Sequence, residues 1–548
     1  MQGQPLVRDG KTLLSGIDPV RRAERTADAV SVKDRTLYFC PSPLYGYGLE
    51  QLLSRLKTEA PDSAVLCLEA DIELFELTKK NIEPSLFADK MLQIINVNPI
   101  NDFKSTFAGV YNLVRDTWGA RAFRRIETIR FTGGWQLYPQ FYDSLNESLR
   151  REIAADWSNA LTMTKLGRLY IRNVLRNLTL VSKYRSVSEM SFGEAPVLVL
   201  GAGPSLDETL DVLSGSFADV LEDPASRSFK IVCVDTCLGV LKDRNITPDL
   251  VVILESQHWN LRDFIGCRGW NIPAAVDLSS LPASANILAG EGYLFFTPWT
   301  SLKIFERLRD VKLLPAAVPP LGSVGLTAVA LARFLTSGKI ICAGIDFSFT
   351  HNKYHARSTP GHRSRLGIQT RLRRILNTAV FDSSSVAAVS KSGLAVHTSP
   401  IMKNYRDTFE QEFGLDSRIF DIESTGLPLG VKTLTMNEAM DMFKNSPRNN
   451  GKKGPRIFAE RRGEELEFFF NNERQRLEEL RGILTGESAA ADKERLSVLI
   501  EECDYLWAHF PDLAGGRKPV LEEGSSIAVS FLKRVRAEID PMLKLVRN

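Results

Sequence analysis

The sequence predicts an α/β protein whose central domain is a doubly wound parallel sheet. The apolar run Val197–Leu200 leads directly into the turn Gly201–Ser205 and then into a helix, which is the order of a buried parallel strand, a tight turn and a crossover helix. Further apolar runs then alternate with helical stretches as far as residue 422. Such alternation is typical of a parallel sheet with helices on both faces.

Six apolar runs of strand length define the predicted central sheet. They are residues 197–200, 231–235, 251–254, 293–297, 340–344 and 418–422. In sheets of this kind, ligands bind beyond the carboxyl ends of the strands. The residues that follow each run are therefore the candidates for a functional site.

The N-terminal part of the chain has a similar but shorter pattern. Leu37–Cys40 and Ala64–Glu69 predict two strands, a helix lies between them, and another helix begins at Ile72. In nucleotide-binding folds an acid at the place of Glu69 holds a ribose hydroxyl. The turn after the first strand lacks the expected glycine spacing, and Tyr45 and Tyr47 would crowd a phosphate. A Rossmann-like domain that binds no nucleotide is the favoured interpretation.

The prediction divides the chain into three domains. They are an N-terminal Rossmann-like domain that ends in connecting helices (1–185), a central domain (186–445) and a C-terminal helical domain (446–548). The connecting segment 145–184 has apolar residues at helical spacing. On it, Asn173 and Asn177 lie one turn apart and either point into the central site or, as we favour, pack the helix.

Composition and charge exclude several classes of protein. The 548 residues include 69 Lys and Arg against 66 Asp and Glu, and this near balance gives no reason to expect nucleic acid as a partner. The seven cysteines form no Cys-x-x-Cys pair, which favours reduced thiols and a cytoplasmic location. The longest run without charge, residues 313–332, contains three prolines and two glycines, so no membrane span is expected.

Polar residues gather after the predicted strands. Gly201, Gly203, Pro204 and Ser205 follow the first strand, Asp235 and Thr236 the second, and Glu255 the third; Gly322 and Ser323 open a later helix, and Asp346 follows the strand 340–344. We expect a capping box between Ser205 and Glu208, and Ser323 as a helix N-cap. Helix N-termini attract phosphate or carboxylate, while strand-end acids suit a ribose or a metal ion.

A loop rich in histidine and arginine follows Asp346. It carries His351, Lys353, Tyr354, His355, Arg357, His362 and Arg363. Three of the six histidines of the chain lie within these twelve positions, which indicates a site for an anionic substrate and for proton transfer. The residues alone therefore describe an enzyme for a phosphorylated, nucleotide-like substrate. No P-loop or kinase signature is present.

Taken together, these motifs resemble the motility accessory factor (Maf) family, the flagellin glycosyltransferases with a DUF115 domain. The motifs that carry the resemblance are Gly201-Ala-Gly-Pro-Ser-Leu, Ile246-Thr-Pro-Asp249, Gly322-Ser-Val-Gly and Gly344-Ile-Asp-Phe, followed by Lys353-Tyr-His-Ala356. The resemblance implies a central domain similar to bacterial sialyltransferases. It also implies transfer of a nonulosonic acid, of the pseudaminic or legionaminic type, from its CMP-activated form to Ser or Thr of flagellin.

The resemblance also implies a role for each candidate residue. Gly201, Gly203, Pro204 and Ser205 would cradle the nucleotide phosphate, and Asp235 and Thr236 would line the nucleotide pocket. Gly322 and Ser323 would close over the cytidine or phosphate, and Asp346 would lie beside a sugar with Tyr354 near it. Arg357, Arg363 or Arg365 would meet the sugar carboxylate. His355 ranks first and His362 second as the base, and no metal or cofactor is expected.

This sequence departs from the family pattern at two places. Glu255 stands where an aspartate is expected, and Leu321-Gly322-Ser323 replaces a Gly-Gly-Ser turn. A glutamate still reaches a ribose hydroxyl or a metal ion, so the first departure weakens the resemblance only slightly.

Two other functions remain open at this point. Proteins with a similar DUF115 domain are 6-hydroxymethylpterin diphosphokinases, which move pyrophosphate from ATP and need Mg²⁺; Asp235, Glu255 and Asp346 would then hold the metal. Alternatively, the chain is a scaffold that binds flagellin without catalysis. A linker at 446–456 precedes three predicted helices, 457–484, 492–510 and 525–546, which suit docking or oligomerisation.

Overall fold

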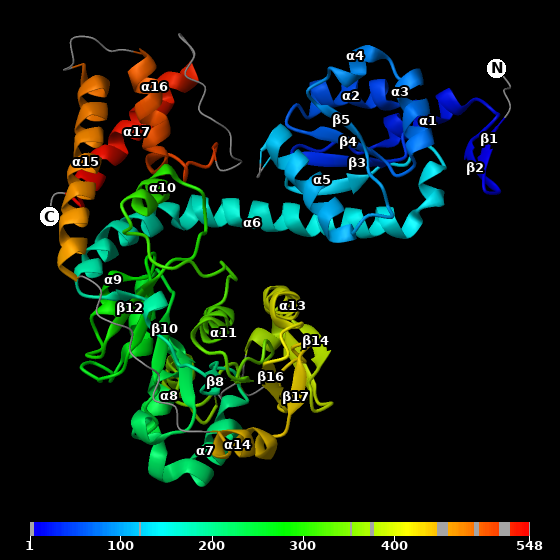
Figure 1. The fold of residues 1–548 in the computed structure, drawn as a ribbon. Helices are drawn as coiled ribbons and strands as arrows, with labels where there is room; N and C mark the ends of the chain where they lie inside the picture. The colour runs from blue at the N-terminus through cyan, green and yellow to red at the C-terminus, as the bar shows by residue number, and fades with distance from the viewer. Residues whose placement is uncertain are drawn as a thin grey trace. The chain divides into compact units, whose positions relative to one another are not determined.

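A computed structural model describes residues 5–119, 122–350, 353–372, 378–446, 459–486, 493–513 and 526–546. Its contacts divide the chain into two compact units, Met1–Arg168 with Leu506–Val535, and Leu169–Tyr505 with Arg536–Asn548. Each of the two units contains a parallel sheet flanked by helices, which confirms the predicted α/β class (Figure 1).

The first unit is built on a four-stranded parallel sheet of order β5-β4-β3-β6. Its strands are β3 (Thr36–Pro41), β4 (Ala64–Glu69), β5 (Leu92–Asn96) and β6 (Arg125–Thr128), preceded by the hairpin β1 (Leu6–Arg8)–β2 (Lys11–Leu14) and by α1 (Pro19–Ala29). The helices that follow are α2 (Leu49–Glu59), α3 (Ile72–Asn81), α4 (Pro84–Phe87), α5 (Phe103–Trp118) and the long α6 (Pro139–Asn177).

Alternating side chains of β3 serve two cores. Tyr38 and Cys40 pack with α2 on one face, while Leu37 and Phe39 pack with α5 and α6 on the other. Glu69 is buried at the end of β4, where its carboxylate accepts bonds from the Ser42 hydroxyl (2.6 Å) and the Asp71 N–H (3.2 Å). These internal partners give Glu69 a structural role in the first unit.

The second unit contains a nine-stranded sheet of order β17-β16-β13-β8-β9-β10-β11-β12-β7, parallel throughout. The strands are β7 (Arg185–Ser186), β8 (Val197–Leu200), β9 (Lys230–Val234), β10 (Leu250–Ile253), β11 (Ala274–Asp277), β12 (Gly292–Phe295), β13 (Ile340–Ala343), β16 (Ile419–Ile422) and β17 (Lys432–Leu434). The helices between them are α7 (Leu206–Leu221), α8 (Leu238–Asp243), α9 (Pro282–Ala285), α10 (Lys303–Asp310), α11 (Val324–Leu335), α13 (Pro400–Phe413) and α14 (Met436–Lys444).

The strand order of this sheet reverses beside β8. The chain runs outward from β8 through β9 to β12 and then returns to place β13 on the other side of β8. Helices α7 and α11 both begin at the carboxyl edge, because α7 follows β8 and α11 leads back to the start of β13. A switch point of this kind leaves a crevice where ligands bind.

All six predicted strands of the central sheet are present, whereas three others were not predicted. β11 consists mostly of small residues (Ala-Ala-Val-Asp), β17 is short and half polar at the sheet edge, and β7 has only two residues. A hairpin of β14 (Val386–Val389) and β15 (Ala395–Thr398), together with α12 (Pro360–Gly367), forms an excursion between β13 and α13 that was also missed. These segments lack the continuous apolar run that identified the others.

The C-terminal part is helical, with α15 (Ala459–Thr485), α16 (Lys493–Glu502) and α17 (Ser526–Leu543). The predicted second helix is shorter than expected because a 3₁₀ turn begins at Asp504. Most of the predicted linker lies outside the described residues. Of the helices in the described ranges, none combines the length and apolar composition that a membrane crossing requires.

Candidate functional site

Two glycine turns meet at the switch point between β8 and β13. The Gly203 N–H donates to the Gly344 carbonyl (2.8 Å), and the Gly201 N–H donates to the Ala343 carbonyl (2.8 Å). A Cβ on Gly203 would lie 2.5 Å from Oδ2 of Asp346 and 2.7 Å from the Gly344 oxygen. The glycines of the turn are therefore required by the close approach of a second backbone.

Asp346 binds the turn directly. Its Oδ2 accepts from the Ser205 N–H (2.7 Å) and its Oδ1 accepts from the Ser205 hydroxyl (2.5 Å). The predicted capping box of Ser205 with Glu208 is wrong, since the Ser205 side chain makes no capping bond on α7. The carboxylate of a distant aspartate takes its place at the helix N-terminus, where negative charge is favoured.

The loop that follows Asp346 is bound to the same turn. The Ala356 N–H donates to the Ala202 carbonyl (3.0 Å), and Asp207 in the first turn of α7 accepts from Lys353 Nζ (2.7 Å) and from the Arg357 N–H (3.1 Å). The loop is thus held against the Gly201–Ser205 turn at two places. His351 lies outside the described residues.

His355 and His362 both lie next to this junction. Burial and Arg365 lower the pKa of His355 to about 4. Burial also lowers the pKa of His362. The negative charge of Asp207 opposes this decrease, and the positive charge of Lys353 adds to it. The ring of Tyr354 lies between those of His355 (4.9 Å) and Phe349 (5.1 Å), and burial raises the pKa of its hydroxyl. At neutral pH His355 is therefore an uncharged imidazole.

The predicted arginines do not gather at one point. Arg363 donates to Asp243 on the surface (2.5 Å), and the Arg357 side chain is exposed. Arg365 lies 5.6 Å from the centroid of the Tyr354 ring. The charge of Arg365 acts on both His355 and His362, whereas that of Arg357 acts on His362.

The N-terminus of α11 offers donors at the same edge of the sheet. Ser323 is its N-cap residue, as predicted, but the Ser323 side chain makes no capping bond. Gly322 has a φ of +74° and is exposed, with Tyr405 packed beside it. The partly exposed first turn of α11 thus keeps backbone N–H groups that no side chain caps, whereas Ser205 is occupied by Asp346.

A second polar cluster lies beyond β9 and β10. Asp235 accepts from the Asn260 amide (2.7 Å) and the Thr236 N–H (2.9 Å), and burial raises the pKa of Asp235 to about 6. Burial, reinforced by the charge of Asp235, raises the pKa of Asp263 to about 7. Glu255 is exposed and accepts from the Gln257 N–H. Within the described ranges, no three His, Cys, Asp or Glu side chains are grouped to hold a metal ion.

The sequence analysis did not identify the lysine whose positive charge stabilises the carboxylate of Asp346. Lys391, in the turn of the β14–β15 hairpin, donates to Asp421 of β16 (2.7 Å), and their side chains are only 4% and 2% exposed. Burial raises the pKa of Asp346, and Lys391 is the strongest influence that opposes this rise. Lys391 belongs to no recognisable motif, because the two carboxylates that it acts on are distant in sequence: Asp346 follows β13 and Asp421 lies in β16.

Asn173 and Asn177 organise two of the carboxyl-end loops. The Asn173 amide donates to the carbonyls of Ser256 (3.1 Å) and Ser279 (3.0 Å), and the Asn177 amide donates to those of Leu278 and Ser280 (both 2.9 Å). The packing interpretation of these residues is confirmed. The turn at 423–430 also reaches the site, since the Leu427 N–H donates to the Asp346 carbonyl (2.8 Å).

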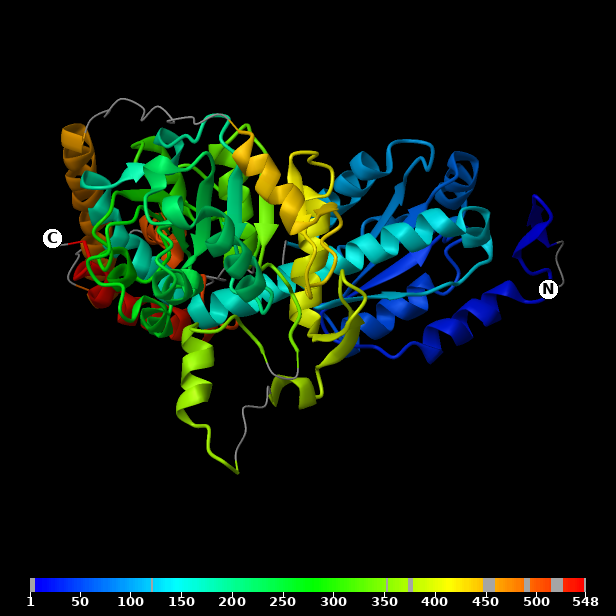
Figure 2. The same cartoon turned by 90° about the horizontal axis from the view of Figure 1, so that it is seen from below.

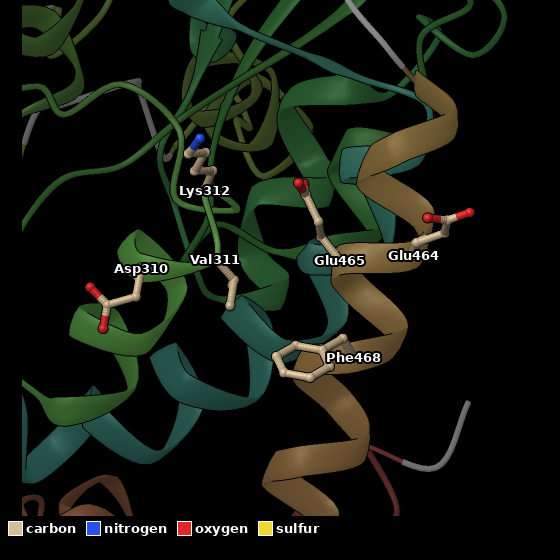
Figure 3. A pocket seen from close by; sticks show the side chains of 6 residues that line it. All are labelled: Asp310, Val311, Lys312, Glu464, Glu465 and Phe468. Atoms are coloured by element: carbon tan, nitrogen blue, oxygen red, sulfur yellow. The ribbon is translucent and has the colours of Figure 1, made fainter.

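Two cavities of the second unit lie away from this junction. One, of about 370 Å³, lies between the end of α10 and α15, and its lining includes Lys312, which follows α10, and Glu465 and Phe468 of α15 (Figure 3). The other, of about 750 Å³, includes Pro196 and Lys339 and so lies at the amino ends of β8 and β13. Neither contains a predicted site residue.

Comparison with known proteins agrees with this architecture. The sequence model of the family described as 6-hydroxymethylpterin diphosphokinase MptE-like matches residues 170–352. An uncharacterized protein of Treponema pallidum (strain Nichols) is 29% identical over 546 residues, which cover 95% of this chain and 90% of the relative. The structure of the MAf glycosyltransferase from Magnetospirillum magneticum AMB-1 superposes with a TM-score of 0.54 at 13% identity, over 100% of this chain and 84% of that chain. The two proteins share a fold.

Proposed function

We propose that the chain is a glycosyltransferase of the Maf/DUF115 type. The MptE-like match to residues 170–352 and the fold shared with the MAf glycosyltransferase support this proposal. Its donor is a CMP-activated nonulosonic acid of the pseudaminic or legionaminic type, and its acceptor is a Ser or Thr hydroxyl of flagellin. The reaction is a single displacement that needs no metal ion.

One observation carries the proposal. The loop with His355 and His362 is bonded to the glycine turn after β8 through Ala356 and Ala202. Two segments separated by about 150 residues therefore converge at the switch point, where a ligand of an α/β sheet is expected. A turn retained only for folding would not need a loop with two histidines bonded to it.

We place the phosphate of the donor at the N-terminus of α11 rather than at Ser205. Asp346 already accepts the N–H and hydroxyl of Ser205, and its own negative charge opposes a phosphate there. The first turn of α11, with Gly322 and Ser323, offers uncapped N–H groups to the phosphate that leaves with CMP. Asp235 and Thr236 follow β9 directly, at the carboxyl edge of the same sheet, and would line the nucleoside.

Neutral His355 is the proposed base. It would take the proton of the acceptor hydroxyl while the bond between the anomeric carbon and the CMP phosphate breaks. His362, beside Asp207, is the alternative base. Arg365 is placed to meet the carboxylate of the sugar because it lies near both Tyr354 and His355.

The family description favours one rival, pyrophosphate transfer from ATP to 6-hydroxymethylpterin. That chemistry needs Mg²⁺ held by oxygen ligands. Of the three acids it would use, Asp346 has both carboxylate oxygens bonded to Ser205, and Asp235 is bonded to Asn260 and Thr236. These internal bonds weigh against the rival.

A product assay separates the two. The protein is incubated with flagellin encoded in the same genome and CMP-pseudaminic or CMP-legionaminic acid in EDTA, and intact flagellin is weighed by mass spectrometry. The proposal expects a gain of one or more nonulosonic acid masses. Formation of hydroxymethylpterin diphosphate from Mg²⁺-ATP, with unmodified flagellin, would favour the rival; neither product, with flagellin still bound, would favour the scaffold.

A further inference from the structure

The excursion after β13 has an unusual surface. We call residues 353–372 and 378–400 the arm; it contains α12 and the hairpin β14–β15. In Figure 2, α12, coloured lime, projects away from the central sheet. The exposed large apolar side chains of the arm are Leu366, Ile368, Leu372, Phe381, Val386, Val389 and Leu394. Single exposed apolar residues are ordinary, but such a gathering is typical of an interaction surface.

The arm is also strongly basic. Residues 353–372 include five Lys and Arg and no Asp or Glu, although the whole chain has a net charge of only +3. Two of the five, Lys353 and Arg363, pair with the acids Asp207 and Asp243 outside the arm. The remainder of the chain is therefore net negative. Charge complementarity favours an acidic partner for the arm.

Within the described ranges, no backbone bond joins the outer edge of the hairpin to another segment. On β15, His397 already exchanges bonds with Phe349 (2.8 and 2.9 Å), so β14 is the outer strand. The Ser390 N–H donates to the Leu394 carbonyl (2.9 Å), and the alternation of an antiparallel ladder then turns the N–H and C=O groups of Ala387 and Val389 outward. An extended segment of another chain can add a strand at such an edge.

Both ends of the arm are attached to the candidate site. At its start, Ala356 is bonded to Ala202 of the glycine turn. Near its end, the Lys391 N–H donates to the Gly426 carbonyl (2.9 Å), and Leu427 is bonded to Asp346. A chain that binds along the arm is therefore brought beside the residues proposed to act on it.

We propose that the arm is the docking surface for the polypeptide acceptor, which binds through an extended segment with acidic and apolar side chains. This inference rests on the proposed function, because it takes the acceptor to be a polypeptide. The segment pairs with the outer edge of β14 and places its apolar and acidic side chains against Leu372 and Arg371. A small-molecule acceptor would need no such surface outside the site.

The test compares two double variants. Arg371→Glu with Leu372→Ser changes the arm, where Leu372 is 97% exposed. Arg268→Glu with Leu415→Ser is the matched control, since Arg268 is exposed and Leu415 is 99% exposed, both away from the arm. For each protein, transfer to flagellin is measured against flagellin concentration at saturating CMP-nonulosonic acid. Hydrolysis of the same donor without flagellin is measured in parallel.

The arm variant should raise KM for flagellin about tenfold, which corresponds to about 1.4 kcal/mol, while donor hydrolysis and the control variant stay within about twofold of the wild type. Val389→Pro, which removes an outward N–H from β14, should raise the same KM. An unchanged flagellin KM in the arm variant, with hydrolysis intact, would overturn the inference. If the arm variant loses binding to phosphatidylglycerol vesicles while its KM for flagellin is unchanged, the arm binds membranes and the inference is overturned.

Failure of the proposed function gives a different result. In that case the wild type would neither transfer nor hydrolyse the donor, and flagellin affinity would be measured directly on immobilised protein. Weaker binding by the arm variant than by the control would still support the docking surface. Equal binding would reject it.

Discussion

At the scale of single residues, Asp346 changes what the glycine turn can do. A Gly-x-Gly-Pro-Ser sequence before a helix suggests that the turn binds phosphate with its N–H groups. Here the N–H and hydroxyl of Ser205 are both bonded to Asp346, and Gly203 allows that carboxylate to approach. The turn therefore joins β8 to β13, and this is why our proposal places the phosphate of the donor at the N-terminus of α11. This exchange is invisible in the sequence because Asp346 lies 141 positions from Ser205.

His355 provides a prediction at the same scale. The pKa of His355 is about 4 in the folded protein, below the ordinary value of 6.5, so the unfolded chain takes up the proton first as the pH falls. The contribution of His355 to stability is therefore present above pH 6.5 and is lost progressively between pH 6.5 and 4. His355→Gln cannot be protonated and should lose less stability over this range, by roughly 1–3 kcal/mol.

Urea unfolding at pH 7.5 and pH 4.5 measures this difference. The wild type should show the larger drop in midpoint between the two conditions. If the wild type and His355→Gln lose the same amount, His355 is not an uncharged, desolvated imidazole in the folded protein. His258→Gln, on an exposed residue, controls for the loss of a histidine as such.

At the scale of elements, the β14–β15 hairpin connects the arm to the core. Its turn inserts Lys391 against Asp421 of β16, and the charge of Lys391 also acts on Asp346. Burial raises the pKa of Asp421 to about 6, and one oxygen of Asp421 has no hydrogen-bond partner. Two buried carboxylates thus depend on one buried cation.

Lys391→Met should therefore destabilise the second unit strongly. Removing one partner of a buried pair typically costs about 3–5 kcal/mol, because the other charge is left uncompensated. Lys391→Met combined with Asp421→Leu should recover much of that loss. Guanidinium unfolding followed by tryptophan fluorescence provides the measurement, with Lys403→Met on exposed α13 as the control. A loss below about 1 kcal/mol in the single variant would mean that water reaches the pair.

At the scale of the whole molecule, the sequence was sufficient for the class of fold and for the edge of the sheet that carries the site. Runs such as Val197–Leu200 and Ile340–Ala343 are fully apolar because both faces of their sheet are covered. The switch point between β8 and β13 was not predicted, because the runs do not reveal the order of the strands in the sheet. β11 and the hairpin β14–β15 were missed, since small or exposed residues carry no strand periodicity.

The same limit applies to the site. Asp346, His355 and the glycine turn were recognised by residue type, and the structure brings them together. Lys391 and Asp207 were missed because their importance depends on partners from other elements. Arg363 was expected at the sugar but pairs with Asp243, a surface contact that spacing alone does not reveal.

The most direct test of the central claim is whether a nucleoside monophosphate binds at this edge without metal. Melting temperatures are measured with CMP in EDTA, with ATP in EDTA and with Mg²⁺-ATP. At a concentration of 100 times Kd, a ligand stabilises the folded state by about 2.7 kcal/mol. We expect CMP in EDTA to raise the melting temperature and Ser323→Trp, which fills the N-terminus of α11, to abolish that rise. A rise with Mg²⁺-ATP alone, and none with CMP, would contradict the account.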